Sequence, residues 1–145
     1  MSEIKIIKGE IYTDARGVIK HVNDFDLEGV CRTYAIHQSD PSVVRAWHGH
    51  QFEKKYFFVV KGSFTFGFVK IDDWENPSDD LVPTIIKVDA SKESQVICIP
   101  EGYANAVKAN EPDSIVIVYS GKRMDVAVLD SWRWDKDKWV DWSKY

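Results

Sequence analysis

Short apolar runs separated by turn-forming residues constrain this chain more than any other feature. In about ten places apolar and polar residues alternate with the period of a β-strand, and no segment carries an apolar stripe with helical spacing. Turn formers such as Asp40-Pro41 and Lys61-Gly62 separate the runs. Strands this short and this regularly spaced favour an antiparallel sandwich or barrel over a parallel sheet with crossover helices. The sequence therefore predicts an all-β fold.

The individual runs locate the expected strands. They lie at residues 4–9, 17–22, 30–36, 55–62, 63–71, 84–89, 95–100, 105–109, 114–119 and 125–130. Within one of these runs, Phe64, Phe66 and Phe68 must share one face, which we expect in the core because aromatic rings bury well. The polar segment 71–81 is expected as an exposed loop between strands.

Size and charge restrict the classes of function. With 145 residues the chain is expected to be one domain, 1–145, and a net charge of -4 disfavours a broad grip on nucleic acid or on anionic membranes. The first ten residues are too charged for a secretion signal, and no apolar run is long enough to span a membrane. Cys31 and Cys98 form no CxxC pair and are expected to be reduced and buried. We expect a cytoplasmic protein.

Residues whose side chains can take part in catalysis or ligand binding concentrate between positions 43 and 62. His48 and His50 are two apart, so on a strand both imidazoles point the same way, as they do when a barrel aims side chains into its lumen. Lys54 and Lys55 are neighbours on the next strand, so one must point inward. The tail carries Trp132, Trp134, Trp139 and Trp142, which we expect to be buried over the barrel or in a dimer seam.

The His-x-His pair, the turn at Gly62 and the downstream segment 100–105 (PEGYAN) together resemble the two motifs of the cupin barrels. In that family four metal ligands are His, His, Glu and His. Here Lys55 stands in place of the glutamate and Asn105 in place of the last histidine. A cation repels a divalent ion, so we expect neither a metal nor another cofactor, and a metal-dependent dioxygenase is the least favoured cupin function.

A cupin with lysine at this position resembles the metal-free dTDP-4-dehydrorhamnose 3,5-epimerases. The segment 45–48 (RAWH) resembles their R-G-L-H motif, Lys55 matches their lysine, and 99–104 (IPEGYA) matches I-P-E-G-F-A. Tyr119 occupies the position at which the family has its tyrosine, and the tail 133–142 is similar to the family's W-x-D and I-x-W segment. The resemblance covers nearly the whole chain. It implies an isomerase of deoxysugar and polysaccharide biosynthesis.

The chemistry of a 4-keto sugar fits these residue types. The ketone acidifies the protons on C3 and C5, so the reaction needs a base, a proton donor on the opposite face and a cation near the C4 oxygen. The resemblance assigns these tasks to His48, Tyr119 and Lys55 respectively. The family's base is oriented by an acidic residue of a C-terminal extension that has no counterpart here, and His50 is expected to orient the base or carry a second proton.

The resemblance also implies how substrate is held. Arg45 and Arg16 are similar to the family's diphosphate-binding arginines, whose planar guanidinium suits phosphate, and we assign Asn105 to substrate binding as well. In the family the counterpart of Arg16 reaches the site of a neighbouring subunit. A homodimer that binds a nucleotide sugar is therefore expected.

Two other functions remain open at this point. The dTDP-sugar 3,4-ketoisomerases carry R-G-F-H-A-H, which resembles 45–50 even more closely, although they have glutamine where Lys55 stands. A non-catalytic sugar-nucleotide binding module would explain the missing acidic residue and the missing histidine at Asn105. The epimerase is the favoured function, the ketoisomerase is the alternative, and the binding module is the third possibility.

Overall fold

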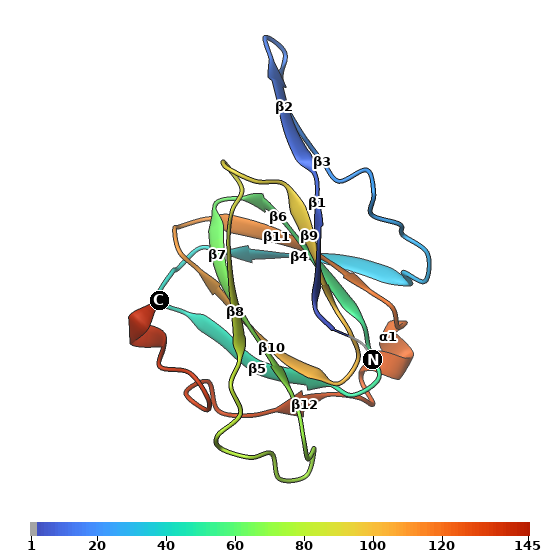
Figure 1. The fold of residues 1–145 in the computed structure, drawn as a ribbon, viewed down its shortest axis with the longest axis vertical. Coiled ribbons are helices and arrows are strands. Elements are labelled where there is room, and N and C mark those ends of the chain that lie inside the picture. Colours follow the sequence, from blue (N-terminus) through green and yellow to red (C-terminus); the bar gives the residue numbers. More distant parts are fainter. Residues whose placement is uncertain (1–2) are drawn as a thin grey trace.

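The computed structural model describes residues 3–145 as an antiparallel β-barrel made of two facing five-stranded sheets (Figure 1). One sheet has the strand order β1-β9-β6-β11-β4 and the other the order β12-β5-β10-β7-β8, while β2 and β3 form a separate ribbon. The strands are β1 (Lys5–Lys8), β2 (Glu10–Asp14), β3 (Gly17–His21), β4 (Arg32–Gln38), β5 (Val44–His50), β6 (Lys55–Lys61), β7 (Ser63–Lys70), β8 (Thr84–Asp89), β9 (Gln95–Ile99), β10 (Tyr103–Ala109), β11 (Ser114–Ser120) and β12 (Trp132–Arg133). The predicted all-β antiparallel fold is confirmed.

Strand alternation places the main core between the two sheets. In β11, Val116 and Val118 are fully buried, whereas Ile117 and Tyr119 lie on the outer face and stay partly exposed. The same alternation in β6 turns Phe57 inward. Apolar side chains of both sheets therefore fill one end of the barrel and leave the other end to the polar residues described below.

The three phenylalanines of β7 lie on one buried face, as the alternation predicts. Phe64, Phe66 and Phe68 are at most 1% exposed, and consecutive rings stack with centroids 5.6 and 5.9 Å apart. The Phe57 ring approaches Phe66 and Phe68 from the facing strand β6. Offset aromatic pairs of this kind stabilise a core beyond the area that they bury.

The turn between β6 and β7 needs glycine. Gly62 has φ +76°, and a Cβ atom there would lie 2.1 Å from the Ser114 Oγ atom. Only glycine adopts this conformation without strain and also leaves the required space. The turn carries the chain from the sheet that contains β6 to the facing sheet that contains β7.

The C-terminal tail covers the outer face of the second sheet. Trp47, Trp142 and small residues of β10 form a second buried cluster there, and Trp74, Trp134 and Trp139 pack against it. Gly67 of β7 makes this possible, since a Cβ atom at that position would lie 2.9 Å from the Trp47 ring. The expectation that the tail tryptophans pack over the barrel is confirmed for Trp134, Trp139 and Trp142.

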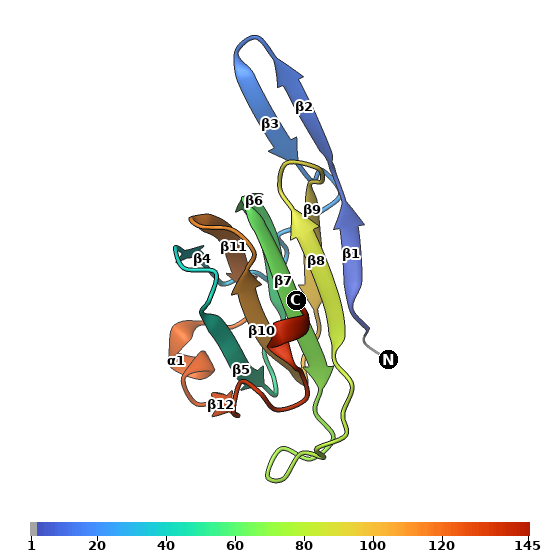
Figure 2. The same cartoon turned by 90° about the vertical axis from the view of Figure 1, so that its left-hand side faces the viewer.

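The ribbon of β2 and β3 projects beyond the barrel, which Figure 2 shows in side view. Its strands pair only with each other among residues 3–145. Tyr12, Val18 and Ile19 are each more than half exposed on it. The ribbon contacts the barrel at its base, where Lys20 donates a hydrogen bond to the Val60 backbone oxygen and Ser94 donates one to that of His21. An isolated two-stranded ribbon is at best marginally stable in water, so its exposed apolar side chains favour a further packing partner.

Two predictions about the chain are wrong. The run 125–130, expected as a strand, overlaps the short helix α1 (Met124–Ala127). Ala127 is buried there, whereas Val126 and the following Val128 are exposed. Cys31 is exposed and Cys98 half-buried, so neither is a core residue.

The C-terminus ends in the short 3₁₀ helix η1 (Trp142–Lys144). Neither helix of the described residues is long and apolar enough to cross a membrane.

Candidate active site

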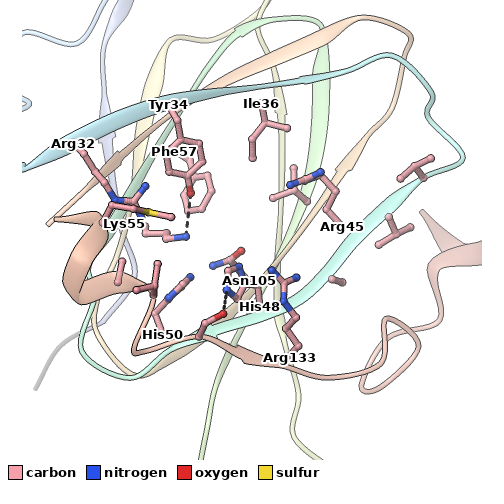
Figure 3. A pocket seen from close by; sticks show the side chains of 18 residues that line it. Arg32, Tyr34, Ile36, Arg45, His48, His50, Lys55, Phe57, Asn105 and Arg133 are labelled. Atoms are coloured by element: carbon pink, nitrogen blue, oxygen red, sulfur yellow. Dashed lines mark hydrogen bonds between the residues drawn. The ribbon is translucent and has the colours of Figure 1, made fainter. Parts of the chain in front are cut away.

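A cavity of about 770 Å³ lies between the sheets at the polar end of the barrel (Figure 3). Strands β4, β5, β6, β10 and β12 and the segment around α1 supply its walls. Its polar lining consists of Arg32, Tyr34, Arg45, His48, His50, Lys55, Asn105, Ser131 and Arg133. The cavity is lined by positively charged, imidazole and hydroxyl groups and also by apolar side chains such as Ile36 and Val107.

The two histidines of β5 face this cavity together, as their spacing predicts. The ring centroids of His48 and His50 are 4.2 Å apart. The Nε2 atom of His48 lies 2.9 Å from the Ser131 Oγ atom, so this nitrogen is already engaged by a hydroxyl group. His50 is almost fully buried at 4% exposure.

The surroundings of His50 select one tautomer. Its Nδ1 atom lies 2.9 Å from the backbone oxygen of Asp130, which can only accept a hydrogen bond, so Nδ1 carries the proton and donates it. Its Nε2 atom is buried and has no hydrogen-bond partner among residues 3–145. A neutral imidazole in this tautomer presents a free lone pair at Nε2. His50 is therefore arranged as a general base, because its Nε2 atom can accept a proton from a bound molecule.

Both imidazoles are held neutral. Burial, followed by the neighbouring His50 and Lys55, lowers the pKa of His48 from its ordinary value to about 3. Burial and then the Lys55 ammonium lower the pKa of His50 to about 4. At neutral pH each ring is therefore unprotonated and has one nitrogen with a lone pair.

Lys55 points into the cavity and Lys54 points out, which resolves the choice that the sequence left between them. Lys55 is 5% exposed, whereas Lys54 is exposed. The Lys55 Nζ atom donates a hydrogen bond of 3.0 Å to the Tyr34 hydroxyl (Figure 3). A buried ammonium beside a hydroxyl is suited to stabilise a negatively charged oxygen of a bound molecule.

Tyr119 does not reach the cavity. It lies on the outer face of the first sheet, where its ring packs against Phe25 with centroids 5.6 Å apart. The cavity holds Tyr34 of β4 instead. The pairing register explains the difference, because Ser120 lies opposite the inward-facing Lys55 and its neighbour Tyr119 must then face outward. The structure thus separates Tyr119 from the other predicted catalytic side chains.

The predicted binding residues divide in the same way. Arg45 and Asn105 line the cavity, and Asn105 lies opposite His48 in the pairing of β10 with β5. Arg16 lies at the tip of the projecting ribbon, where its guanidinium pairs with Asp14 and its side chain is 84% exposed. The structure thus does not bring Arg16 into the cavity of its own chain.

Several residues in or beside the cavity were not predicted. Arg32 and Arg133 add two guanidinium groups to the lining. Asp130 fixes the loop after β5, since its carboxylate accepts hydrogen bonds from the backbone N–H groups of Gln51 and Phe52. The one available signal for Asp130 was its acidic side chain directly after four apolar residues, 126–129. Arg32 and Arg133 carried no spacing signal.

Within residues 3–145, no group of three or more His, Cys, Asp or Glu side chains is arranged to hold a metal ion. The cavity wall instead presents the Lys55 ammonium beside the two histidines.

The two facing antiparallel sheets form a barrel with the cupin fold. No protein-family model and no curated protein sequence matches this chain. Solved structures do: the rmlC epimerase of Mycobacterium tuberculosis superposes with a TM-score of 0.73 at 20% identity, covering 96% of this chain and 74% of the other. ChmJ, a 3′-monoepimerase from Streptomyces bikiniensis in complex with dTDP-quinovose, has a TM-score of 0.74 at 15% identity, covering 92% and 70%.

A third similar structure is QdtA, a sugar 3,4-ketoisomerase from Thermoanaerobacterium thermosaccharolyticum in complex with TDP. It has a TM-score of 0.67 at 20% identity, covering 97% of this chain and 94% of that one. The suspected resemblance to sugar-nucleotide cupins is confirmed at the level of the fold.

Proposed function

We propose that this protein is an epimerase acting on a nucleotide-linked 4-keto-6-deoxy sugar. The observation that supports it is the arrangement of three cavity groups: the free Nε2 atom of His50 on the second sheet, the Tyr34 hydroxyl on the first, and the Lys55 ammonium beside that hydroxyl. Epimerisation removes a proton from one face of a carbon and returns one to the other face. A base and a donor on facing walls meet that requirement.

The reaction follows from these positions. His50 Nε2 takes the proton from the carbon next to the ketone, and the electron pair of that C–H bond forms an enolate whose oxygen Lys55 stabilises. Tyr34 accepts the hydrogen bond from Lys55, so its own proton is free to be donated to the opposite face of the carbon. The enolate collapses to the ketone. His50 is left protonated and Tyr34 deprotonated, and exchange with water resets both.

Two arginines of the cavity are assigned to the nucleotide end of the substrate. Arg45 and Arg133 line the cavity away from the Lys55 wall, and a guanidinium group binds a diphosphate through paired hydrogen bonds. Asn105 lines the cavity opposite His48 in the pairing of β10 with β5 and can hydrogen-bond the sugar. Bound dTDP-quinovose in ChmJ and bound TDP in QdtA support a dTDP-linked substrate for a barrel of the same fold. A substrate of this kind places the reaction in deoxysugar biosynthesis. The protein's two free cysteines favour a cytoplasmic location.

The assembly proposed is a homodimer. On the β2–β3 ribbon Tyr12, Val18 and Ile19 are each more than half exposed, and a second copy of the chain is the partner that we propose buries them. Arg16, at the tip of this ribbon, is 84% exposed and lies outside the lining of its own cavity, so a role in substrate binding requires the cavity of a second copy. Light scattering at micromolar concentration should report twice the 16.7 kDa chain mass. A clean monomer would contradict the dimer.

One observation favours a second function, the 3,4-ketoisomerase. His48 and His50 lie side by side on one wall, with ring centroids 4.2 Å apart. Two proton carriers on the same side of a sugar could move a proton between C3 and C4 without inversion. Lys55, which the ketoisomerase motif lacks, makes this the second candidate.

Product analysis separates the candidates. Incubation of dTDP-4-keto-6-deoxyglucose with the protein, followed by NMR, should show inversion at C3, at C5 or at both. A ketone that has moved to C3 would replace the epimerase with the isomerase. An unchanged sugar that nevertheless binds would indicate the non-catalytic module.

The same assay distinguishes the two tyrosines. Tyr34→Phe removes the proposed donor and should lower the rate of inversion by about 100-fold, since a positioned acid contributes roughly 10²- to 10⁴-fold. Tyr119→Phe is the matched control on the outer face and should stay within about threefold of the wild-type rate. Equal loss in both variants, or loss in Tyr119→Phe alone, would refute the assignment of Tyr34.

A further inference from the structure

A buried carboxylate joins the groups of the cavity that the reaction uses. Glu53 lies in the loop between β5 and β6, and its side chain is 0% exposed. Its Oε2 atom accepts hydrogen bonds from the Arg32 Nη2 atom at 3.1 Å and from the Ser120 Oγ atom at 2.6 Å. Lys55 Nζ lies 4.0 Å from the same oxygen.

The second oxygen of this carboxylate faces the proposed base. Glu53 Oε1 lies 3.3 Å from the His50 Nδ1 atom and has no hydrogen-bond partner among residues 3–145. His50 Nδ1 therefore has two acceptors beside it, the Asp130 backbone oxygen and the Glu53 carboxylate. When Nε2 takes up a proton, the ring becomes a cation with a carboxylate directly behind it.

Stability alone does not account for such a group. A carboxylate removed from water needs charged partners, and a buried ion pair commonly contributes no more to stability than apolar side chains of the same size. Glu53 has Arg32 and Lys55 as partners, and both line the cavity. Its negative charge also offsets one of these two cations, which would otherwise both oppose a positive charge on His50.

We propose that Glu53 is a positioning residue that acts together with the Asp130 backbone oxygen to hold the proton of His50 on Nδ1, keeps Nε2 free as the base, and anchors the Lys55 ammonium. This inference rests on the proposed function for its effect on rate. Its effect on His50 is independent of any substrate.

The substitution Glu53→Gln tests the proposal because it sets a donor against a donor. Arg32 and Ser120 both donate to the Oε2 position, so the amide oxygen of glutamine must occupy it. The amide NH₂ group is then left at the Oε1 position, facing the Nδ1–H group of His50. The Nδ1–H tautomer should lose population, and turnover should fall by about 10- to 100-fold, as expected when a residue that orients a reacting group is lost.

The measurement is a two-bond ¹H–¹⁵N correlation spectrum of ¹⁵N-histidine protein at pH 7, which reports the tautomer of each ring. Wild-type protein should show His50 with its proton on Nδ1, and Glu53→Gln a mixture that includes Nε2–H. The affinity for dTDP should stay within threefold of wild type. Glu53→Asp, which retains a carboxylate, should restore the Nδ1–H tautomer and part of the turnover.

A matched control uses the surface pair of Asp113 and His37, whose atoms Oδ1 and Nε2 are 3.0 Å apart. Asp113→Asn makes the same carboxylate-to-amide change beside a histidine outside the cavity and should leave turnover unchanged. An Nε2–H tautomer of His50 in wild-type protein overturns the proposal whether or not Glu53→Gln folds. An unaltered tautomer and rate in Glu53→Gln also overturns it. If wild-type protein turns over no 4-keto sugar, the proposed function fails while the spectra still decide the role of Glu53.

Discussion

Replacing His50 with asparagine should lower turnover of a 4-keto sugar nucleotide by about 1000-fold, within the range that a general base contributes. The asparagine amide can still donate to the Asp130 backbone oxygen in place of Nδ1, so the loop geometry should persist. What is lost is the Nε2 lone pair. The expected result is a protein with near-native thermal stability and dTDP affinity but almost no turnover, measured by NMR of the sugar product.

His48→Asn is the comparison for this prediction. Its Nε2 atom is engaged by Ser131, so His48 should contribute to the shape and polarity of the wall, with a loss of about 10-fold when it is replaced. The reverse order, with His48→Asn far more damaging than His50→Asn, would return the role of the base to His48. That was the role assigned to it from the sequence.

Replacing Lys55 with methionine should lower turnover by about 100- to 1000-fold. Methionine keeps most of the stem volume and removes the charge, and loss of one preorganised donor at a developing oxyanion costs about 3 to 4 kcal/mol of transition-state stabilisation. Binding of dTDP through Arg45 and Arg133 should be retained, because neither guanidinium depends on Lys55. Rate and affinity should therefore separate, which calorimetry with dTDP and a kinetic assay would measure.

Lys54→Met is the matched control for this change, one residue away on the solvent side. It should leave turnover within threefold of wild type, so that damage to the start of the strand is excluded as the cause. Equal activity of Lys54→Met and Lys55→Met would mean that no enolate is stabilised at Lys55, and the likeness to the solved structures would then speak only for the fold.

The sequence was sufficient for those parts of the site that follow strand alternation. His48 and His50 were predicted on one face, and Lys54 and Lys55 on opposite faces, because side chains alternate along any strand whatever its partners are. Tyr119 was misplaced because its direction depends on how β11 pairs with β6. Once Ser120 is set opposite Lys55, Tyr119 must face outward, and this register is a tertiary property.

Residues outside regular strands could not be placed from periodicity. Glu53 belongs to a loop, where no repeat relates one side chain to the next, so its burial depends on Arg32 and Ser120 from distant strands. The run 125–130 alternates like a strand, but Met124–Ala127 forms a helix. Its apolar residues Val126 and Val128 stay exposed beside the cavity. A short alternating run thus does not by itself distinguish a strand from a helical turn.

The isotope content of the epimerised carbon tests the central claim most directly. The reaction is run in deuterated water with dTDP-4-keto-6-deoxyglucose, and deuterium at C3 and C5 of the product is measured by NMR. Because the proton returned by Tyr34 comes from a group that exchanges with water, each inverted carbon should carry close to one deuterium. An inverted product without deuterium at the inverted carbon, or a ketone that moves to C3 with the original hydrogen retained, would contradict proton abstraction by His50 and return by Tyr34.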